Sequence, residues 1–142
     1  MDRDELFLVV AERMPSANLL HHVLAVEAIM RGLAAHLGED VDKWGLAGLL
    51  HDIDYQETKD KPNLHGVVAA EELHLMGVSD EICYAVRVHN PLLGLPRRSL
   101  MDKALYAADP LSGLIVACAL VTRDKKLANV DTDFVMMRFK EK

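Results

Sequence analysis

The chain has 142 residues, of which 51% are apolar and 27% charged, and it carries a net charge of −6. This length and balance are typical of one globular domain with its own hydrophobic core, so we expect a single domain over residues 1–142. The acidic charge argues against a nucleic-acid polymer as partner, which needs a basic face, but not against a small anionic substrate held by a metal and a few local cations.

Proline, glycine and polar runs divide the chain into pieces of helical length, and the alternation typical of strands is nearly absent. Helices are expected at residues 2–13, 17–37, 41–53, 63–76, 80–89, 99–108 and 111–121. A weaker helix or an extended tail follows them. The sequence therefore predicts an all-α fold, a compact bundle of about six to eight helices.

Three of these helices carry further local signals. Ser79 is a natural N-cap for the fifth helix. Ser99, followed three residues later by Asp102, resembles a capping box at the start of the sixth. Residues 111–121 are apolar nearly all round, which predicts a buried central helix.

The sequence also favours the cytoplasm over a membrane or an oxidising compartment. The longest apolar run, residues 113–121, is too short to span a bilayer. The N-terminal residues 1–5 lack the basic start of a signal peptide. Cys83 and Cys118 form no CxxC pair and lie in apolar runs, which is typical of reduced, buried thiols.

The second helix indicates which of two adjacent histidines faces inward. At 100° per residue its apolar side chains gather on one face, and His22 lies at the edge of that face. His21 points to nearly the opposite side. We therefore expect His22 to face the core and His21 to face solvent. The side chains that define the face are Leu19, Val23, Val26, Met30, Leu33 and Leu37.

Other ligand-type side chains also lean toward the core. They are His51 and Asp52 at the end of an apolar helix, His65 and His89 on apolar faces, and Asp109 at the end of the sixth helix. A single inward histidine is more often a satisfied core residue, and an aspartate before proline is commonly a helix cap. Together, four histidines and two aspartates on separate helices are the donors that a metal site in a bundle requires, and they suit divalent transition metals.

The order of these residues is similar to that of a known family. His22, then His51-Asp52 within Leu-Leu-His-Asp-Ile, then Asp109 within Ala-Leu-Tyr-Ala-Ala-Asp resembles the HD superfamily of metal-dependent phosphohydrolases. The resemblance runs from about residue 19 to residue 121. It implies an HD-domain helical bundle.

His65 and His89 look like the two extra histidines of the family members that hold two metals. The resemblance then implies two divalent ions, whose identity could be Fe, Mn, Co, Ni, Zn or Mg. In that arrangement Asp52 bridges the two ions. The remaining ligands are His22, His51 and Asp109 for one ion, and His65 and His89 for the other.

The chain also departs from the family pattern. Where many relatives have His-Asp-Ile-Gly, often followed by Lys, this chain has His51-Asp52-Ile53-Asp54-Tyr55. The cyclic-dinucleotide branch relies on that Gly and Lys and on a downstream Gly-Tyr-Pro segment, which is missing, so we set that substrate aside. The variant is similar to a prokaryotic subgroup of small HD hydrolases.

The expected reaction is hydrolysis of a phosphoester in a nucleotide or another small phosphorylated metabolite. Two metals about 3.5–4 Å apart can lower the pKa of a shared water and clamp the phosphoryl oxygens. Asp52 and Asp54 are the candidate catalytic residues. Asp54 could orient the attacking water, hold a ligand imidazole through its second nitrogen, or cap a turn.

The candidate substrate-binding residues are Arg97, Arg98, Ser99 and Lys59. Residues 97–99 are the favoured group, because a helix N-terminus there would add backbone donors for an anion.

Two other functions stay open. The same ligands fit an enzyme that holds two irons and activates dioxygen, and also a metal-stabilised domain that senses a nucleotide without catalysis. Hydrolysis is favoured over the sensor because the ligand set is complete. The apolar run 134–137 would suit a homodimer contact.

Overall fold

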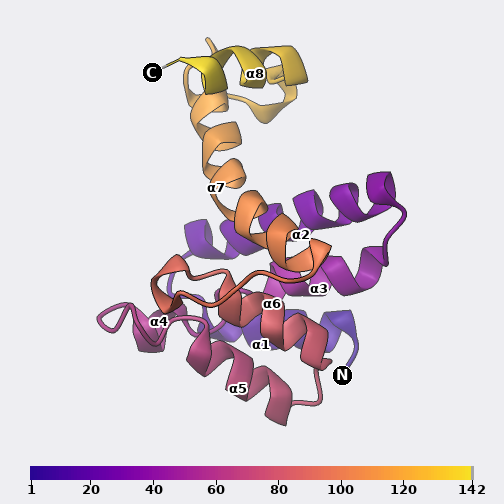
Figure 1. Cartoon of the computed structure of the whole chain (residues 1–142). Helices are drawn as coiled ribbons and strands as arrows, with labels where there is room; N and C mark the ends of the chain where they lie inside the picture. The colour runs from indigo at the N-terminus through magenta and orange to yellow at the C-terminus, as the bar shows by residue number, and fades with distance from the viewer. Residues whose placement is uncertain (142) are drawn as a thin grey trace. The chain divides into compact units, whose positions relative to one another are not determined.

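The computed structural model describes residues 1–141, and within that range every regular element is a helix. Eight of these elements are α-helices, which confirms the all-α bundle expected from the sequence. In chain order (Figure 1) the elements are α1 (Arg3–Arg13), α2 (Ala17–Leu37), α3 (Val41–Leu50), α4 (Tyr55–Thr58), α5 (Val67–Leu75), α6 (Asp80–Val88), η1 (Pro91–Leu93), α7 (Leu100–Leu120), η2 (Leu127–Asn129) and α8 (Thr132–Lys140).

The chain divides into two compact units. The first is Met1–Ala108 and contains α1 to α6, η1 and the first part of α7. The second begins at Asp109 and contains the rest of α7, η2 and α8. The expectation of one domain over the whole chain stays a prediction.

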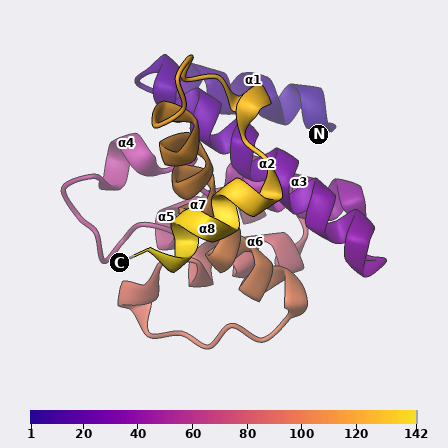
Figure 2. The same cartoon turned by 90° about the horizontal axis from the view of Figure 1, so that it is seen from above.

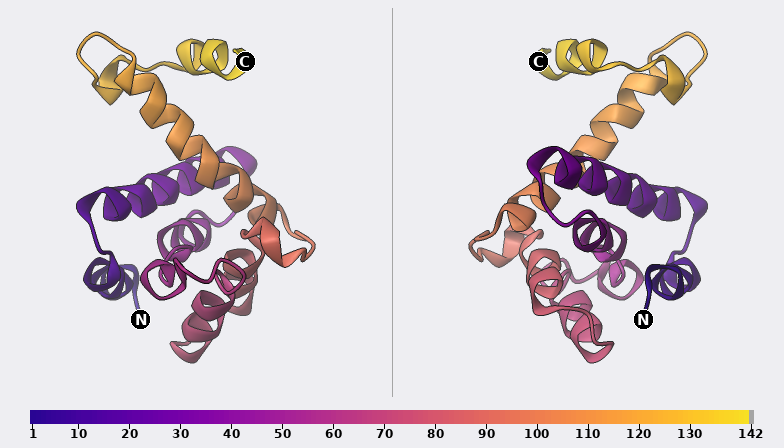
Figure 3. Two further views of the ribbon diagram at one scale, coloured as in Figure 1. Left: turned by 90° about the vertical axis from the view of Figure 1, so that its left-hand side faces the viewer. Right: turned by 90° about the vertical axis from the view of Figure 1, so that its right-hand side faces the viewer.

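The hydrophobic core of the described chain lies in the first unit, around α3. This helix contacts α1, α2 and α6, and α5 packs beside α6 (Figure 3). Leu6, Met30, Leu49 and Leu73 come from four different helices and are at most 1% exposed. Burial of a side chain of this size stabilises a fold by about 1.5–3 kcal/mol. The core therefore fixes the helices whose ends carry the polar residues described below.

Gly48 allows α3 to lie very close to α2. A Cβ atom on Gly48 would lie 2.8 Å from the backbone N and Cα of Glu27. A real Cβ cannot occupy that position without displacing one of the helices. Because Gly48 lies three residues before His51, the approach also fixes the distance between the histidines of α2 and the end of α3.

We expect Gly48→Ala to destabilise the protein by about 1–3 kcal/mol, the usual cost of overpacking a core. The measurement is the free energy of unfolding in denaturant. Gly32→Ala is the matched control, because among residues 1–141 no heavy atom outside its own helix backbone comes within 4 Å of a Cβ there. That variant should be neutral or more stable by up to about 1 kcal/mol. Equal effects of the two substitutions would contradict the argument.

Side-chain caps fix several helix starts as the sequence predicts. The hydroxyl of Ser79 accepts a hydrogen bond from the N–H of Ile82, at 3.5 Å. The N–H of Ser99 donates to Oδ2 of Asp102, and the N–H of Asp102 donates to the hydroxyl of Ser99, each at 3.0 Å. Both the N-cap at Ser79 and the capping box at Ser99 are confirmed.

One long helix, α7, replaces the two helices expected at 99–108 and 111–121. Pro110 lies inside it, so the expected break is wrong. A proline keeps a helical φ, and its cost is local, because one carbonyl loses its hydrogen bond and the ring crowds the preceding turn. Alanine and leucine on both sides are strong helix formers and continue the helix.

The second half of α7 is not the buried helix expected at residues 111–121. Val116, Leu120 and Val121 are 47%, 57% and 55% exposed. The main cluster of buried apolar side chains ends at Ala108, and of residues 111–121 only Ser112, Cys118 and Ala119 are buried. Apolar composition alone predicted burial here, but burial needs a packing partner, which sequence periodicity does not supply.

By length and composition, α7 could also cross a membrane. The apolar run 113–121 was expected to be too short, but it has merged with the residues before it into a 21-residue helix. One such helix is weak evidence, because core helices of globular proteins pass the same test. The expected absence of a membrane partner therefore stays a prediction.

The connections around α4 and η1 differ from those expected. α3 ends at Leu50 rather than at residue 53, and α4 is a short helix in a region expected to be a polar break. α5 begins only after Gly66, whose φ of +88° lies in the left-handed region and ends any preceding helix. After η1 an extended segment leads to α7 (Figure 2). As a result His51 and His65 lie in turns, not inside helices.

Candidate metal centre

The helical phase of α2 separates the two adjacent histidines as expected. His22 is half-buried with a side-chain exposure of 26%, whereas His21 is exposed. The prediction that His22 faces inward is confirmed.

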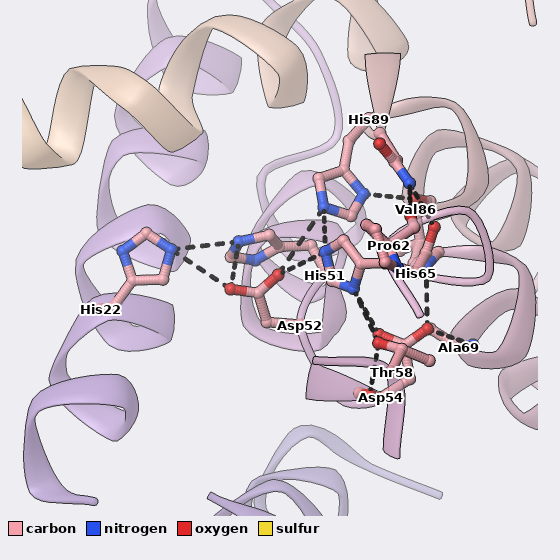
Figure 4. Close-up of polar contacts among 12 residues, drawn as sticks. His22, His51, Asp52, Asp54, Thr58, Pro62, His65, Ala69, Val86 and His89 are labelled. Carbon is pink, nitrogen blue, oxygen red and sulfur yellow. Dashed lines mark hydrogen bonds and ion pairs between the residues drawn. The ribbon is translucent and has the colours of Figure 1, made fainter. Parts of the chain in front are cut away.

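Asp52 lies at the middle of a cluster of four histidines (Figure 4). Nε2 of His22 and Nε2 of His51 lie 3.4 Å and 3.3 Å from its Oδ2 atom. Nε2 of His65 and Nε2 of His89 lie 3.1 Å and 3.7 Å from its Oδ1 atom. The two carboxylate oxygens therefore face two different pairs of histidines.

The second ring nitrogen of three of these histidines is held by a protein oxygen. Nδ1–H of His51 donates to the carbonyl of Gly48 at 2.7 Å, and Nδ1–H of His89 donates to the carbonyl of Val86. Nδ1–H of His65 donates to Oδ1 of Asp54 at 2.8 Å. Since these oxygens accept, each Nδ1 carries a proton, and Nε2 is the ring nitrogen that each histidine turns toward the cluster.

The converging Nε2 atoms fit a cation. Nε2 of His22 lies 3.3 Å from Nε2 of His51, and Nε2 of His65 lies 3.1 Å from Nε2 of His89. Lone pairs at that separation repel each other unless a proton or a metal ion lies between them. Neutral imidazole and ionised carboxylate are the donors that divalent transition metals prefer. His51, Asp52 and His89 also bring one ligand atom each to within 4.8 Å of one another.

Asp54 is fully buried and uses both of its carboxylate oxygens within the protein. Oδ1 accepts from His65, and Oδ2 accepts from the N–H groups of Gly66 and Ala69 at 2.8 Å and 3.0 Å. Of the three roles considered from the sequence, this geometry favours holding a ligand imidazole. A carboxylate bound to the second nitrogen of a ligand histidine fixes its tautomer and raises its basicity.

The charges of the cluster shift two pKa values in opposite directions. Burial of Asp52 raises its pKa, but the charge of His51 and hydrogen bonds from the histidines outweigh that effect, so the net pKa lies well below its ordinary value. Burial lowers the pKa of His65, but the carboxylates of Asp52 and Asp54 outweigh it and raise the pKa to about 9.

Metal-free protein should therefore lose stability as the pH rises from about 6.5 to about 9. The folded state binds the His65 proton more tightly than the unfolded state, whose pKa is near 6.5, so the stabilisation is complete below pH 6.5 and disappears through pH 9. The measurement is the free energy of unfolding of chelator-treated protein at several pH values, with His65→Gln as reference. A pH dependence that is identical in both proteins would contradict the assignment.

A family comparison agrees with this geometry. The HD domain family model matches residues 19–119. The chain belongs to the HD domain family. This match confirms the resemblance expected over residues 19–121. HD domains are in general metal-dependent hydrolases, and the histidine and aspartate cluster of this chain fits their use of divalent metals.

Several curated relatives of this HD domain carry the name Ribonuclease Y. The protein from Desulfotalea psychrophila is 38% identical over 96 residues, which is 68% of this chain and 18% of the relative. The protein from Oleidesulfovibrio alaskensis is 35% identical over 98 residues, which is 69% of this chain and 18% of the relative. The chain thus spans less than a fifth of the length of these relatives.

Asp109 lies inside α7 and is the first residue of the second unit. The sequence predicted that Asp109 ends a helix, and this prediction is wrong because α7 continues to Leu120. Its backbone carbonyl accepts a hydrogen bond from the hydroxyl of Ser112 at 2.7 Å. Its role as a ligand of the HD site stays a prediction.

Three of the four residues expected to bind substrate have partners within the protein. The N–H groups of Arg98 and Ser99 both donate to Oδ2 of Asp102, so the expected backbone donors for an anion are already used. The guanidinium of Arg97 lies 3.8 Å from the ring centre of Tyr106. Lys59 is exposed at the end of α4. A substrate role for these residues stays a prediction.

Sequence reasoning missed two residues that shape the cluster. Asn90 and Gly66 each follow a candidate ligand directly in the chain, which is the one signal that could have singled them out. A Cβ on Gly66 would lie 2.9 Å from the carbonyl oxygen of Arg87 and 3.0 Å from that of Val86. Only glycine allows the turn that carries His65 to lie this close to the end of α6.

Proposed function

We propose that this HD domain is a metal-dependent phosphohydrolase that binds two divalent ions and hydrolyses a phosphoester of a nucleotide or another small phosphorylated metabolite. The observation that supports it most is the division of the Asp52 carboxylate between two histidine pairs. A carboxylate in that arrangement can bridge two ions. Such ions supply Lewis acidity and make a shared water acidic enough to attack near neutral pH.

The proposed ligands divide into two sets. His22 and His51 would hold one ion, with Asp109 as the further ligand expected from the sequence, and His65 and His89 would hold the other. Asp52 would serve both sets, because its two oxygens face different histidine pairs. The identity of the ions follows from availability as well as from the ligands, and Fe, Mn, Co, Ni, Zn and Mg are all candidates.

The residues around the ligands orient them for this role. The carbonyls of Gly48 and Val86 and the carboxylate of Asp54 fix three imidazoles with their Nε2 atoms toward Asp52. Because the ligands are fixed before an ion binds, little reorganisation is needed when substrate oxygens enter the site. Asp54 acts through His65 in this proposal and does not touch the substrate.

A second candidate substrate is a phosphodiester bond in RNA. The curated relatives are named Ribonuclease Y, which weakens the prediction that nucleic-acid polymers are excluded. The net charge of −6 still favours a small substrate, because the chain has no excess of positive charge to bind a polymer backbone. Both substrates need the same in-line displacement at phosphorus.

A substrate panel tests the proposal. Phosphomonoesters, nucleotides and a short oligoribonucleotide are each incubated with the protein and added Mn²⁺, Fe²⁺, Co²⁺, Ni²⁺ or Mg²⁺. We expect release of phosphate or of shorter nucleotides above the rate of an Asp52→Ala control. Metal-loaded protein that hydrolyses none of them above that control would refute the proposal.

Oxidation chemistry and nucleotide sensing are the other outcomes of this test. Iron-loaded protein that consumes dioxygen and shows a mixed-valent iron signal would favour the oxygenase. Protein that binds nucleotides but turns over no substrate would favour a sensor. Hydrolysis is preferred, because hydrolases are the general class of the HD domain family.

A further inference from the structure

Asn90 joins the turn that carries His65 to the helix end that carries His89. Asn90 directly follows His89 in the chain and is only 7% exposed. Nδ2 donates to the carbonyl of Pro62 at 2.7 Å and to the carbonyl of His65 at 2.9 Å. Oδ1 accepts from the N–H of Leu92 at 3.1 Å. Both amide hydrogens and the amide oxygen are therefore in use.

His65 needs such a restraint more than the other histidines of the cluster. His22 lies within α2, and His51 and His89 are the C-cap residues of α3 and α6. His65 lies in the turn between α4 and α5, where no helical hydrogen-bond ladder fixes the backbone. Asp54 holds its ring and Asn90 holds its carbonyl, so the ring and the backbone are fixed separately.

We propose that Asn90 is a positioning residue for the ion held by His65 and His89, and that it sets the affinity of that ion without changing the affinity of the ion beside His22 and His51. The proposal rests on the two-ion site proposed above. The 3.1 Å separation between Nε2 of His65 and Nε2 of His89 is the distance that Asn90 controls. Partners that orient a metal ligand typically change metal affinity by 10–100-fold when they are lost.

The chemistry of the contact requires an amide. Two carbonyl oxygens face Nδ2 and one N–H faces Oδ1, and only asparagine supplies two donors and an acceptor at this length. Asn90→Asp keeps the shape and the acceptor but places a negative charge against the carbonyls of Pro62 and His65. Asn90→Ala removes the donors without adding charge.

The test is a titration of metal-free protein with Co²⁺. Calorimetry and the visible absorption of the bound ion measure the number of ions and their affinities. Wild-type protein should bind two ions. In Asn90→Asp and Asn90→Ala, the affinity for one ion should stay within about twofold and the affinity for the other should fall by about 10–100-fold. Asn129→Asp is the matched control, because it also loses amide donors, here to Asp124 in the second unit, and it should bind both ions normally.

Hydrolysis provides an independent readout of the same variants. If Asn90 acts through ion affinity, raising the Co²⁺ concentration should restore the activity of Asn90→Asp, whereas a general packing defect would not respond to metal. Wild-type protein that binds two ions but hydrolyses nothing would refute the proposed function and leave the role of Asn90 standing, provided that the variants still lose one ion.

Three results would overturn the inference about Asn90. The first is a variant that binds both ions with unchanged affinity. The second is wild-type protein that binds a single ion. The third is loss of both ions, or of the folded circular dichroism spectrum, in Asn90→Asp and Asn90→Ala alike, which would make Asn90 a residue of the fold alone.

Discussion

Asp52→Asn should lower kcat for phosphoester hydrolysis by on the order of 10³-fold or more, equivalent to about 4 kcal/mol of activation free energy. The amide keeps the size of the side chain but removes its negative charge and replaces one of the two oxygens with a nitrogen that cannot bind a cation. The two oxygens of Asp52 face different histidine pairs. In either orientation of the amide, one pair therefore faces the nitrogen and lacks a carboxylate oxygen. Metal content should fall together with activity.

The measurement combines kcat with metal content by elemental analysis. Asp42→Asn in α3 provides the control for the same substitution, because Asp42 pairs with Arg31 at 2.8 Å and its side chain is 85% exposed. Exposed ion pairs contribute at most about 1 kcal/mol, so this control should keep both its activity and its metal. An Asp52→Asn protein with full activity and full metal content would exclude Asp52 as a bridging ligand.

The second large effect is expected at the adjacent histidines of α2. His22→Ala should remove a metal ion and most of the activity, whereas His21→Ala should change neither. His22 presents Nε2 to Asp52 and His51 at 3.4 Å and 3.3 Å, whereas His21 is exposed. The two variants share the same helix and the same substitution, so differences in helix propensity cancel between them.

Metal content and thermal stability distinguish the two variants. A bound ion stabilises the folded state by about 4 kcal/mol when free metal exceeds the dissociation constant by 1,000-fold. Added metal should therefore raise the melting temperature of His21→Ala more than that of His22→Ala. Equal metal content and equal shifts in both variants would remove His22 from the proposed ligand set.

The sequence by itself determined the helical class, most helix bounds and the inward histidine of α2. α2 was expected at 17–37 and is found at Ala17–Leu37, and the capping box at Ser99 and Asp102 is present. Each of these depends on residues within one or two turns of each other, because helical phase and capping are local properties. His51-Asp52 could be singled out in the same way, as polar residues at the end of an apolar helix.

Only the tertiary structure decided which distant groups meet. The partner of Asp54 is His65, 11 positions away, and the partner of Asn90 is the carbonyl of Pro62, 28 positions away. Local patterns also failed in α7. The helix continues through Pro110 where a break was expected, and several apolar side chains of residues 111–121 are exposed where burial was expected. The physical reason is the same in each case: a local pattern states what a side chain can donate, accept or bury, but the packing of separate helices determines which group it reaches.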